Sequence, residues 1–232
     1  MKILVKSFLV LCLMAMVAAP IFAQRTTISV SDFSRISMSR SGTVYVTQGN
    51  TTKVEVVASD NVIEDLDIEV RGSELLIKNK KRNGWGGSNG KLEVYVVTPD
   101  IEGLAVSGSG KIITENKIKS SDLRVAISGS GKVVTNVDAR SIKLSISGSG
   151  NAELSGTSQS LSASISGSGG VRGESLQVDT CEVTISGSGS CELHVNKSID
   201  ARTSGSGSVK YHGNPEHINS KSSGSGSVKK VG

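Results

Sequence analysis

The tetrapeptide Ser-Gly-Ser-Gly occurs seven times in the last 126 residues of this chain, and its regular spacing restricts the fold more than any other feature. The copies begin at Ser107, Ser128, Ser147, Ser166, Ser186, Ser204 and Ser223. Successive copies start 18 to 21 residues apart. A period of about 20 residues is typical of solenoids, in which each repeat forms one coil that stacks on the previous coil.

Apolar residues stand at odd distances from the first serine of each motif. One residue upstream, for example, are Val106, Ile127, Ile146, Ile165 and Ile185. This period of two predicts strands with one buried face, and it is not the period of a helix. We therefore predict an all-β fold, a parallel β-helix or solenoid with a Gly-Ser-Gly corner about every 19–20 residues. The general rule for crossover connections predicts a right-handed coil.

The same alternation places both glycines of each motif inward and both serines outward. Glycine suits a tight corner because it reaches positive φ without steric cost and leaves room between facing sheets. The predicted corner glycines are Gly108, Gly110, Gly129, Gly131, Gly148, Gly150, Gly167, Gly169, Gly187, Gly189, Gly205, Gly207, Gly224 and Gly226. The outward serines could bind a regular surface such as a glycan, or they could simply be soluble turn residues.

Three segments away from the corners vary in length and composition, namely 115–121, 155–160 and 212–217. We expect them to be return loops, where binding specificity would reside. At the last coil, the inward positions become Ser220 and Ser222, which predicts a polar end to the solenoid.

The first 23 residues have the pattern of a secretion signal peptide. Lys2 and Lys6 precede an apolar run from Phe8 to Ala19, and the segment from Pro20 to Ala23 then gives a cleavage site before Gln24. We expect export and no membrane span after cleavage. Residues 24–232 are then expected to form a single β-solenoid domain, with degenerate N-terminal coils at 24–100 and the seven repeats at 101–232. Alternation in the first part predicts strands at 43–46, 53–57, 66–70, 75–78 and 92–97.

The sequence offers few groups for chemistry. Its net charge of +5, or about +3 without the signal, and its lack of a basic cluster with aromatic residues argue against nucleic-acid binding. Cys181 and Cys191 stand at inward positions of one coil, and they could form a disulfide or remain buried free thiols. Trp85 lies among glycines and could contact a ligand or fold back onto the first coils.

No catalytic, cofactor or metal residues are predicted. His212 and His217 share one expected loop, but a spacing of five residues is a weak metal signal. Polysaccharide hydrolysis would require a pair of carboxylates close together. The acidic residues of the repeats are instead scattered along the sequence. They include Glu153, Asp179, Glu182, Glu192 and Asp200.

The chain resembles the family named "putative auto-transporter adhesin, head GIN domain", a domain of unknown function. The resemblance rests on the Gly-Ser-Gly corners, on Ser41 to Val46, on Leu75 to Ile77, and on Thr98 to Ile101 leading into the first motif. It implies a two-sheet superhelix, export in a Gram-negative bacterium and a role in cell adhesion. It brings no catalytic residues.

Three functions remain open from the sequence. The first is a non-enzymatic adhesin in the periplasm or on the cell surface that binds a glycan, a host surface or a protein partner. The second is a periplasmic structural or sensing scaffold. A polysaccharide-active enzyme is the weakest of the three, because neither the residues nor the resemblance supplies an active site.

Overall fold

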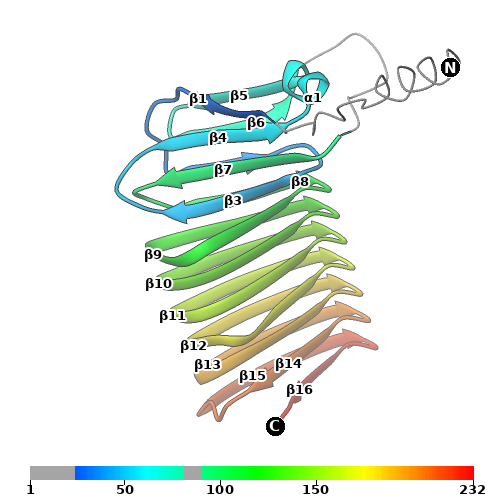
Figure 1. The fold of residues 1–232 in the computed structure, drawn as a ribbon. Helices are drawn as coiled ribbons and strands as arrows, with labels where there is room; N and C mark the ends of the chain where they lie inside the picture. The colour runs from blue at the N-terminus through cyan, green and yellow to red at the C-terminus, as the bar shows by residue number, and fades with distance from the viewer. Residues whose placement is uncertain (1–23, 81–89) are drawn as a thin grey trace, which may run out of the picture.

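The computed structural model describes residues 24–80 and 90–232. The predicted signal segment and Trp85 lie outside these residues. The chain forms a tall stack of coils (Figure 1). Its elements are β1 (Gln24–Ile28), β2 (Arg35–Met38), β3 (Thr43–Gln48), β4 (Lys53–Ala58), α1 (Asp60–Glu64), β5 (Leu66–Arg71), β6 (Glu74–Asn79), β7 (Leu92–Thr98), β8 (Gly103–Gly108), β9 (Lys111–Gly129), β10 (Lys132–Gly148), β11 (Asn151–Gly167), β12 (Gly170–Gly187), β13 (Ser190–Gly205), β14 (Ser208–His212), β15 (His217–Gly224) and β16 (Ser227–Lys230).

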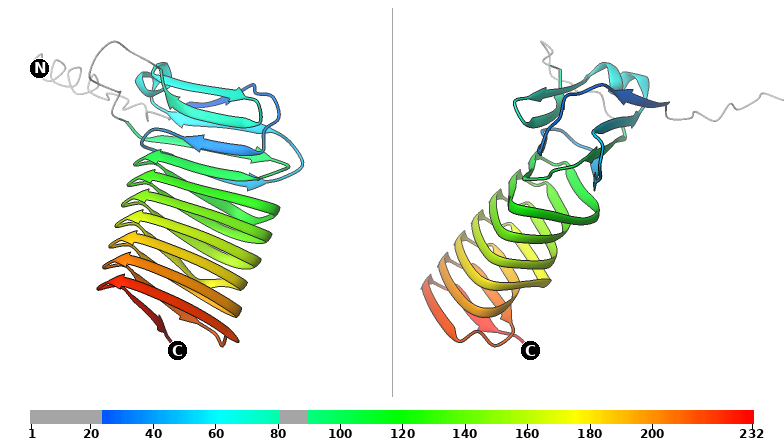
Figure 2. Two further views of the ribbon diagram at one scale, coloured as in Figure 1. Left: turned by 180° about the vertical axis from the view of Figure 1, so that it is seen from behind. Right: turned by 90° about the vertical axis from the view of Figure 1, so that its left-hand side faces the viewer.

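The repeats form the long strands β9 to β13, which contain 16 to 19 residues each and pair in parallel with their neighbours. Each strand bends in its middle, so that one strand makes nearly a whole coil (Figure 2). The first halves continue β3, and together they form sheet A. The second halves continue β8, and together they form sheet B. The predicted β-solenoid is confirmed.

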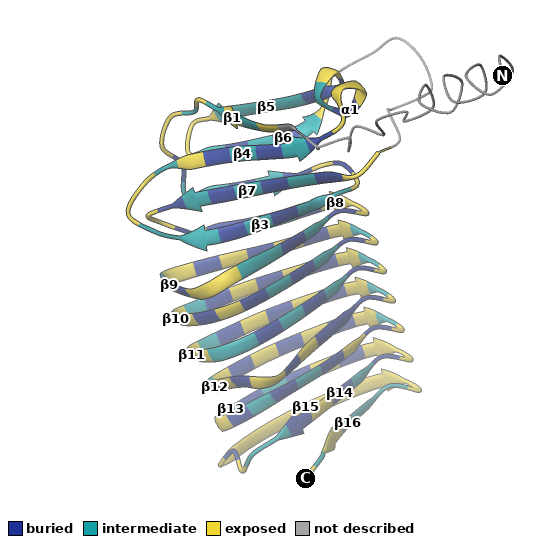
Figure 3. Ribbon diagram, in the orientation of Figure 1, coloured by how far each residue is buried: buried dark blue, intermediate teal, exposed yellow. Residues whose placement is uncertain are grey.

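The inward residues of successive coils stack into ladders that form the core. Ile127, Ile146, Ile165 and Ile185 are paired in register from coil to coil, and each is at most 2% exposed. Along each long strand, buried and exposed residues alternate, as the period of two predicts (Figure 3). Since a single coil could not bury these side chains alone, the fold is stabilised by contacts between neighbouring coils.

The Gly-Ser-Gly corners connect sheet B to sheet A and stack directly on one another. The first glycine of every motif has φ between 95° and 117°. At one corner, the Ser149 amide donates to the Gly129 carbonyl at 2.8 Å, and the Asn151 amide donates to the Gly131 carbonyl at 3.0 Å. The ladder of backbone hydrogen bonds therefore continues through the turn.

The two glycines of a motif have different roles. The second one, such as Gly150, is buried, and a Cβ there would overlap the side chain of Ile127. The first one lies at the turn and is only partly buried or exposed. A Cβ on Gly148 would lie 2.7 Å from the Gly129 carbonyl oxygen, along the stack. The expectation that both glycines point inward is therefore wrong for the first, whereas both serines are exposed as expected.

Two of the three expected return loops are strand. Segments 115–121 and 155–160 lie within β9 and β11 and pair in parallel with β10. Their variable length is absorbed by irregularities in the pairing, such as the shift between Val134 and Asn136. Of the three, only the last contains a loop, between β14 and β15. The prediction failed because polar residues that alternate on the outside of a bend resemble a loop in sequence.

The N-terminal part contains all five predicted strands, as β3 to β7, together with β1, β2 and α1. Its coils do not follow chain order. In sheet B, β2 pairs with both β6 and β8, and in sheet A, β3 pairs with both β7 and β9. The coil made of β2 and β3 therefore lies between two coils that come later in the chain, one made of β6 and β7 and one made of β8 and β9. Antiparallel strands close this end, since β4 pairs with β7 and β1, and β5 pairs with β6.

We expect Gly148→Ala to destabilise the fold by about 1–3 kcal/mol, because its φ of +108° is unfavourable for alanine and the new Cβ meets the Gly129 carbonyl. Ser149→Ala, at the exposed neighbouring position, is expected to change stability by less than about 0.5 kcal/mol. Urea unfolding measures both values. Equal effects would contradict the role assigned to the corner glycine.

Ile146→Asp should prevent cooperative folding, because it places an unpaired carboxylate in the middle of the core ladder, where Ile146 is 2% exposed. The matched control is Ser145→Asp, one residue away on the exposed face of the same strand. Circular dichroism melts should show a normal transition for the control and none for Ile146→Asp. A wild-type melt for Ile146→Asp would refute the register.

Candidate functional site

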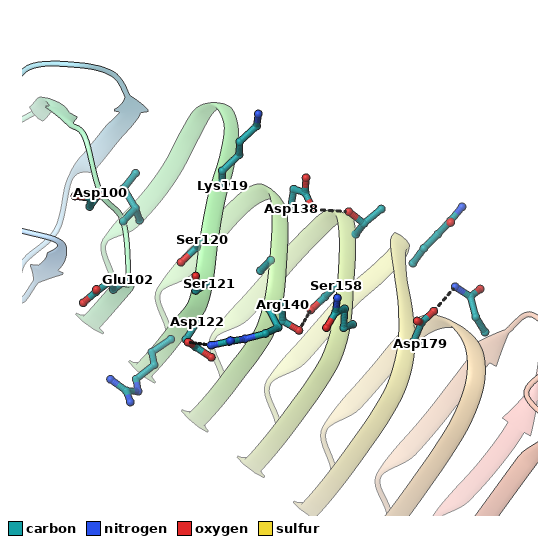
Figure 4. A pocket seen from close by; sticks show the side chains of 17 residues that line it. Asp100, Glu102, Lys119, Ser120, Ser121, Asp122, Asp138, Arg140, Ser158 and Asp179 are labelled. Atoms are coloured by element: carbon teal, nitrogen blue, oxygen red, sulfur yellow. Dashed lines mark hydrogen bonds and ion pairs between the residues drawn. The ribbon is translucent and has the colours of Figure 1, made fainter.

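The edge of the solenoid opposite the corners carries a polar groove of about 1010 Å³ (Figure 4). It begins at the segment 100–102, between β7 and β8, and crosses the bends of β9 to β13. We call it the bend groove. The groove follows the bends because each long strand turns here from sheet A into sheet B, so the polar side chains at the turns of successive coils face the same side.

One polar residue stands at the apex of each bend. Ala139 and Ser141 pair with residues of both neighbouring strands, whereas Arg140 between them has no partner in either ladder. The equivalent residues of the other long strands stand, like Arg140, seven positions before the first serine of their motif. They are Ser121, Gln159, Asp179 and Lys197.

Hydrogen bonds and ion pairs between coils organise the groove. Asp122 accepts hydrogen bonds from the Ser141 hydroxyl at 2.7 Å and from the Arg140 guanidinium at 2.7 Å. In the next coils, the Thr157 hydroxyl donates to Asp138 at 3.1 Å. Each of these contacts joins side chains on consecutive strands, so the groove surface repeats with the period of the coils.

Asp179 anchors the far end of the groove. Lys197 forms an ion pair with it at 2.8 Å, and the Asn196 amide donates to it at 3.3 Å. The hydrogen bond from Lys197, followed by that from Asn196, lowers the pKa of Asp179. The hydrogen bond from Ser141, followed by that from Arg140, lowers the pKa of Asp122 in the same way. Both carboxylates are therefore ionised at neutral pH.

Gln48 completes the groove where β9 is irregular. Its side-chain amide donates to the Pro99 and Lys119 carbonyls, both at 3.0 Å, and its side-chain oxygen accepts from the Lys119 amide at 2.7 Å. These bonds replace the backbone pairing that a regular strand would supply. They fix the position of Lys119, which lines the groove.

Several groove side chains keep unused hydrogen-bonding capacity. Four lining side chains form no hydrogen bond or ion pair with any described residue. They are Asp100, Lys119, Gln159 and Gln177. Together the lining residues include five carboxylates and three basic groups, so the groove is slightly acidic. It can offer both donors and acceptors to a polar ligand.

Of the features singled out in the sequence, segments 115–121 and 155–160 and Asp179 contribute to this groove, whereas the other acidic residues and the histidines lie elsewhere. Glu182 lies on sheet B and pairs with Arg202 at 3.2 Å, whereas Glu192 lies on sheet A and contacts His212 at 2.9 Å. His217 opens β15, in the other sheet from His212. The described part of the chain contains no group of three His, Cys, Asp or Glu side chains placed to hold a metal ion.

Cys181 and Cys191 are buried free thiols in the structure. Burial raises the pKa of Cys181 to about 12 and that of Cys191 well above its usual value. Both thiols are therefore protonated at neutral pH, which makes them poor nucleophiles. They pack in the core as small apolar side chains.

The sequence reasoning found part of the groove, because segments 115–121 and 155–160 were expected to carry binding specificity, but it missed the bends of β10, β12 and β13, although a signal was present. Seven positions before each motif, an odd distance that should be apolar, the residue is polar in all five long strands. This break in the alternation marks the bend, where the phase of the strand shifts by one residue.

We expect Ser141→Ala to raise the pKa of Asp122 toward its ordinary value, because the largest cause of its lowering is the Ser141 hydrogen bond. Carboxyl chemical shifts followed by NMR during a pH titration measure this change. Thr157→Ala, which removes a hydroxyl from Asp138 instead, is the matched control and should leave Asp122 unchanged. An unchanged pKa in Ser141→Ala would refute the contact.

Solved structures with the same fold come from Bacteroides and Parabacteroides species. A structure titled as a putative adhesin from Bacteroides fragilis is 23% identical with a TM-score of 0.79, and one titled as a putative lipid binding protein from Parabacteroides distasonis is 24% identical with a TM-score of 0.73. A third, titled as a putative adhesin from Parabacteroides merdae, is 20% identical with a TM-score of 0.69. Each alignment covers 90% of this chain and 96% of the other.

At these identities the likeness shows the fold alone. No protein with a curated description matches the chain. In the described ranges, no helix is long and apolar enough to span a membrane. The sequence family described as "Putative auto-transporter adhesin, head GIN domain" matches residues 32–215, which is most of the chain. The protein therefore belongs to this family, as its corner motifs predict.

Proposed function

We propose that the protein is an exported, non-enzymatic adhesin that binds an extended neutral glycan along the bend groove. The observation that carries this proposal is the groove itself, a continuous polar surface on one edge of the solenoid with unused donors and acceptors on several coils. Membership of an adhesin family supports a binding role and export.

The shape of the groove suits a linear polymer. The bends of β9 to β13 span about 19 Å, at about 4.8 Å per coil. A ligand lying along the solenoid axis would meet a new apex residue at each coil. Since one coil spacing is about the length of a sugar ring in an extended chain, successive sugars can contact successive coils.

The chemistry of the groove suits hydroxyl groups. Carboxylates accept hydrogen bonds, guanidinium and ammonium groups donate them, and the Gln159 and Gln177 amides do both. The hydroxyl groups of a neutral glycan likewise both donate and accept hydrogen bonds. The excess of carboxylates over basic groups disfavours sulfated or uronic polymers, because like charges would be brought together.

The carboxylates favour binding over hydrolysis. A glycosidase needs one carboxylic acid whose pKa is raised so that it can protonate the leaving group. In the groove, Asp122 and Asp179 have lowered pKa values because hydrogen bonds stabilise their ionised forms. They can accept hydrogen bonds from a ligand but cannot serve as that acid.

Binding should weaken by about tenfold in Gln159→Ala/Gln177→Ala, since each lost hydrogen bond contributes about 0.5–1.5 kcal/mol. A glycan array followed by calorimetry on the best neutral glycan measures the change. Ser149→Ala/Ser168→Ala alters two exposed hydroxyls on the opposite edge and is the matched control. An equal loss in both variants, or no loss in the first, would place the ligand elsewhere.

Location separates this proposal from a periplasmic scaffold or sensor. Protease treatment and antibody labelling of intact cells should detect an adhesin, whereas a periplasmic protein is protected until the cells are lysed. Protection on intact cells would contradict adhesion, and crosslinking in the periplasm would then identify the partner.

A further inference from the structure

Both ends of the solenoid leave strand edges without a partner. At the C-terminal end, β15 pairs only with β13, and β16 pairs only with β14. At the N-terminal end, β1 pairs only with β4, and β5 pairs only with β6. In the described chain, each end therefore presents one free strand edge from sheet A and one from sheet B. Such edges are templates for pairing with another chain.

Apolar side chains accompany these free edges. Ile218 on β15 is 53% exposed, although it continues an inward ladder in which Ile199 is only 2% exposed. Val228 on β16 is partly buried beside it in the other sheet. The N-terminal end has a rim of partly buried apolar residues. They are Ile28, Val30, Ile63, Ile68 and Val70.

The two ends differ in charge, although the N-terminal end also carries the exposed Arg25 and Arg71, which pair with Glu55 and Glu69. Exposed lysines lie on the last strands at the C-terminal end, and they are Lys221, Lys229 and Lys230. Carboxylates lie on α1 and β5 at the N-terminal end, and they are Asp60, Glu64, Asp67 and Glu69. Asp67 and Glu69 contact Lys78, whereas Asp60 and Glu64 have no ion-pair partner among the described residues.

We propose that the protein assembles end to end with a second copy of itself, the basic C-terminal end of one copy on the acidic N-terminal end of the next. Contact between two C-terminal ends would bring lysines together, and contact between two N-terminal ends would bring carboxylates together. Of the three arrangements, only head to tail brings the lysines of one copy toward the carboxylates of α1 and β5 on the next, and it covers Ile218 with the apolar rim.

The strand directions specify how the copies join. In sheet B, β6 runs in the same direction as the later strands, including β15, whereas β5 runs in the opposite direction. β15 would therefore pair with β5 of the next copy in the antiparallel sense. β1 is antiparallel to β4, which is itself antiparallel to β7, so β16 would pair with β1 of the next copy in the parallel sense. Because the two surfaces differ, the contact repeats and builds a filament rather than a closed dimer.

Charge reversal at single ends tests the proposal. The variants are Lys221→Glu/Lys229→Glu at one end and Asp60→Lys/Glu64→Lys at the other. Sedimentation velocity over a wide concentration series should show growing rods for the wild type, which weaken at high salt. Each variant alone should remain monomeric, and an equal mixture of the two should assemble again because each altered end then meets its complement.

A matched control carries the same charge change away from the ends. Lys117→Glu/Lys143→Glu alters two exposed lysines on β9 and β10 and should assemble like the wild type. Thermal melts check that every variant is folded. A wild type that stays monomeric at all concentrations would overturn the proposal. So would assembly of Asp60→Lys/Glu64→Lys alone, since that result indicates contact between like ends.

Discussion

The stacking of glycine on glycine at the corners is the constraint on which the rest of the solenoid depends. The turn needs a left-handed residue, and each corner also accepts a hydrogen bond from the next at a distance that leaves no room for a Cβ. From Gly129 onward each corner therefore stacks on another glycine corner, whereas the first corner, 107–110, stacks on the turn at 39–42, which has Arg40 in place of the first glycine. This stacking keeps neighbouring coils in register, and in-register coils bring Ile127, Ile146 and Ile165 into one ladder.

Much of the repeat region could be predicted from the sequence because the physical signals there are local. Alternation of apolar and polar residues identifies the buried face, and the spacing of the motifs gives the height of the stack in coils. The bend is the exception. Arg140, Gln159 and Asp179 occupy a position that strict alternation would assign to the core. Gln159 was assigned to an expected loop, whereas the bends at Arg140 and Asp179 were not recognised, so the groove was predicted only in part.

The N-terminal part resisted prediction because its pairing is not local. Its strands were evident from alternation, but nothing in a single strand tells which neighbour it pairs with or in which direction. The order of the coils depends on contacts between residues far apart, such as Val44 with both Val94 and Ile112. Gln48 illustrates the same limit, since its role as a substitute for backbone pairing depends on residues 51 and 71 positions away.

The coil made of β2 and β3, which lies between two coils formed by later strands, also determines how the protein responds to a pulling force. A force pulling on β1 first separates it from β4, its single partner among the described strands. It then reaches β2 and β3, which are clamped between coils made from later parts of the chain. Because each of these strands is hydrogen-bonded on both edges, removing it requires the hydrogen bonds to two neighbouring strands to break together. The coil of β2 and β3, the first complete coil in the sequence, thus resists unfolding that begins at the N-terminal end.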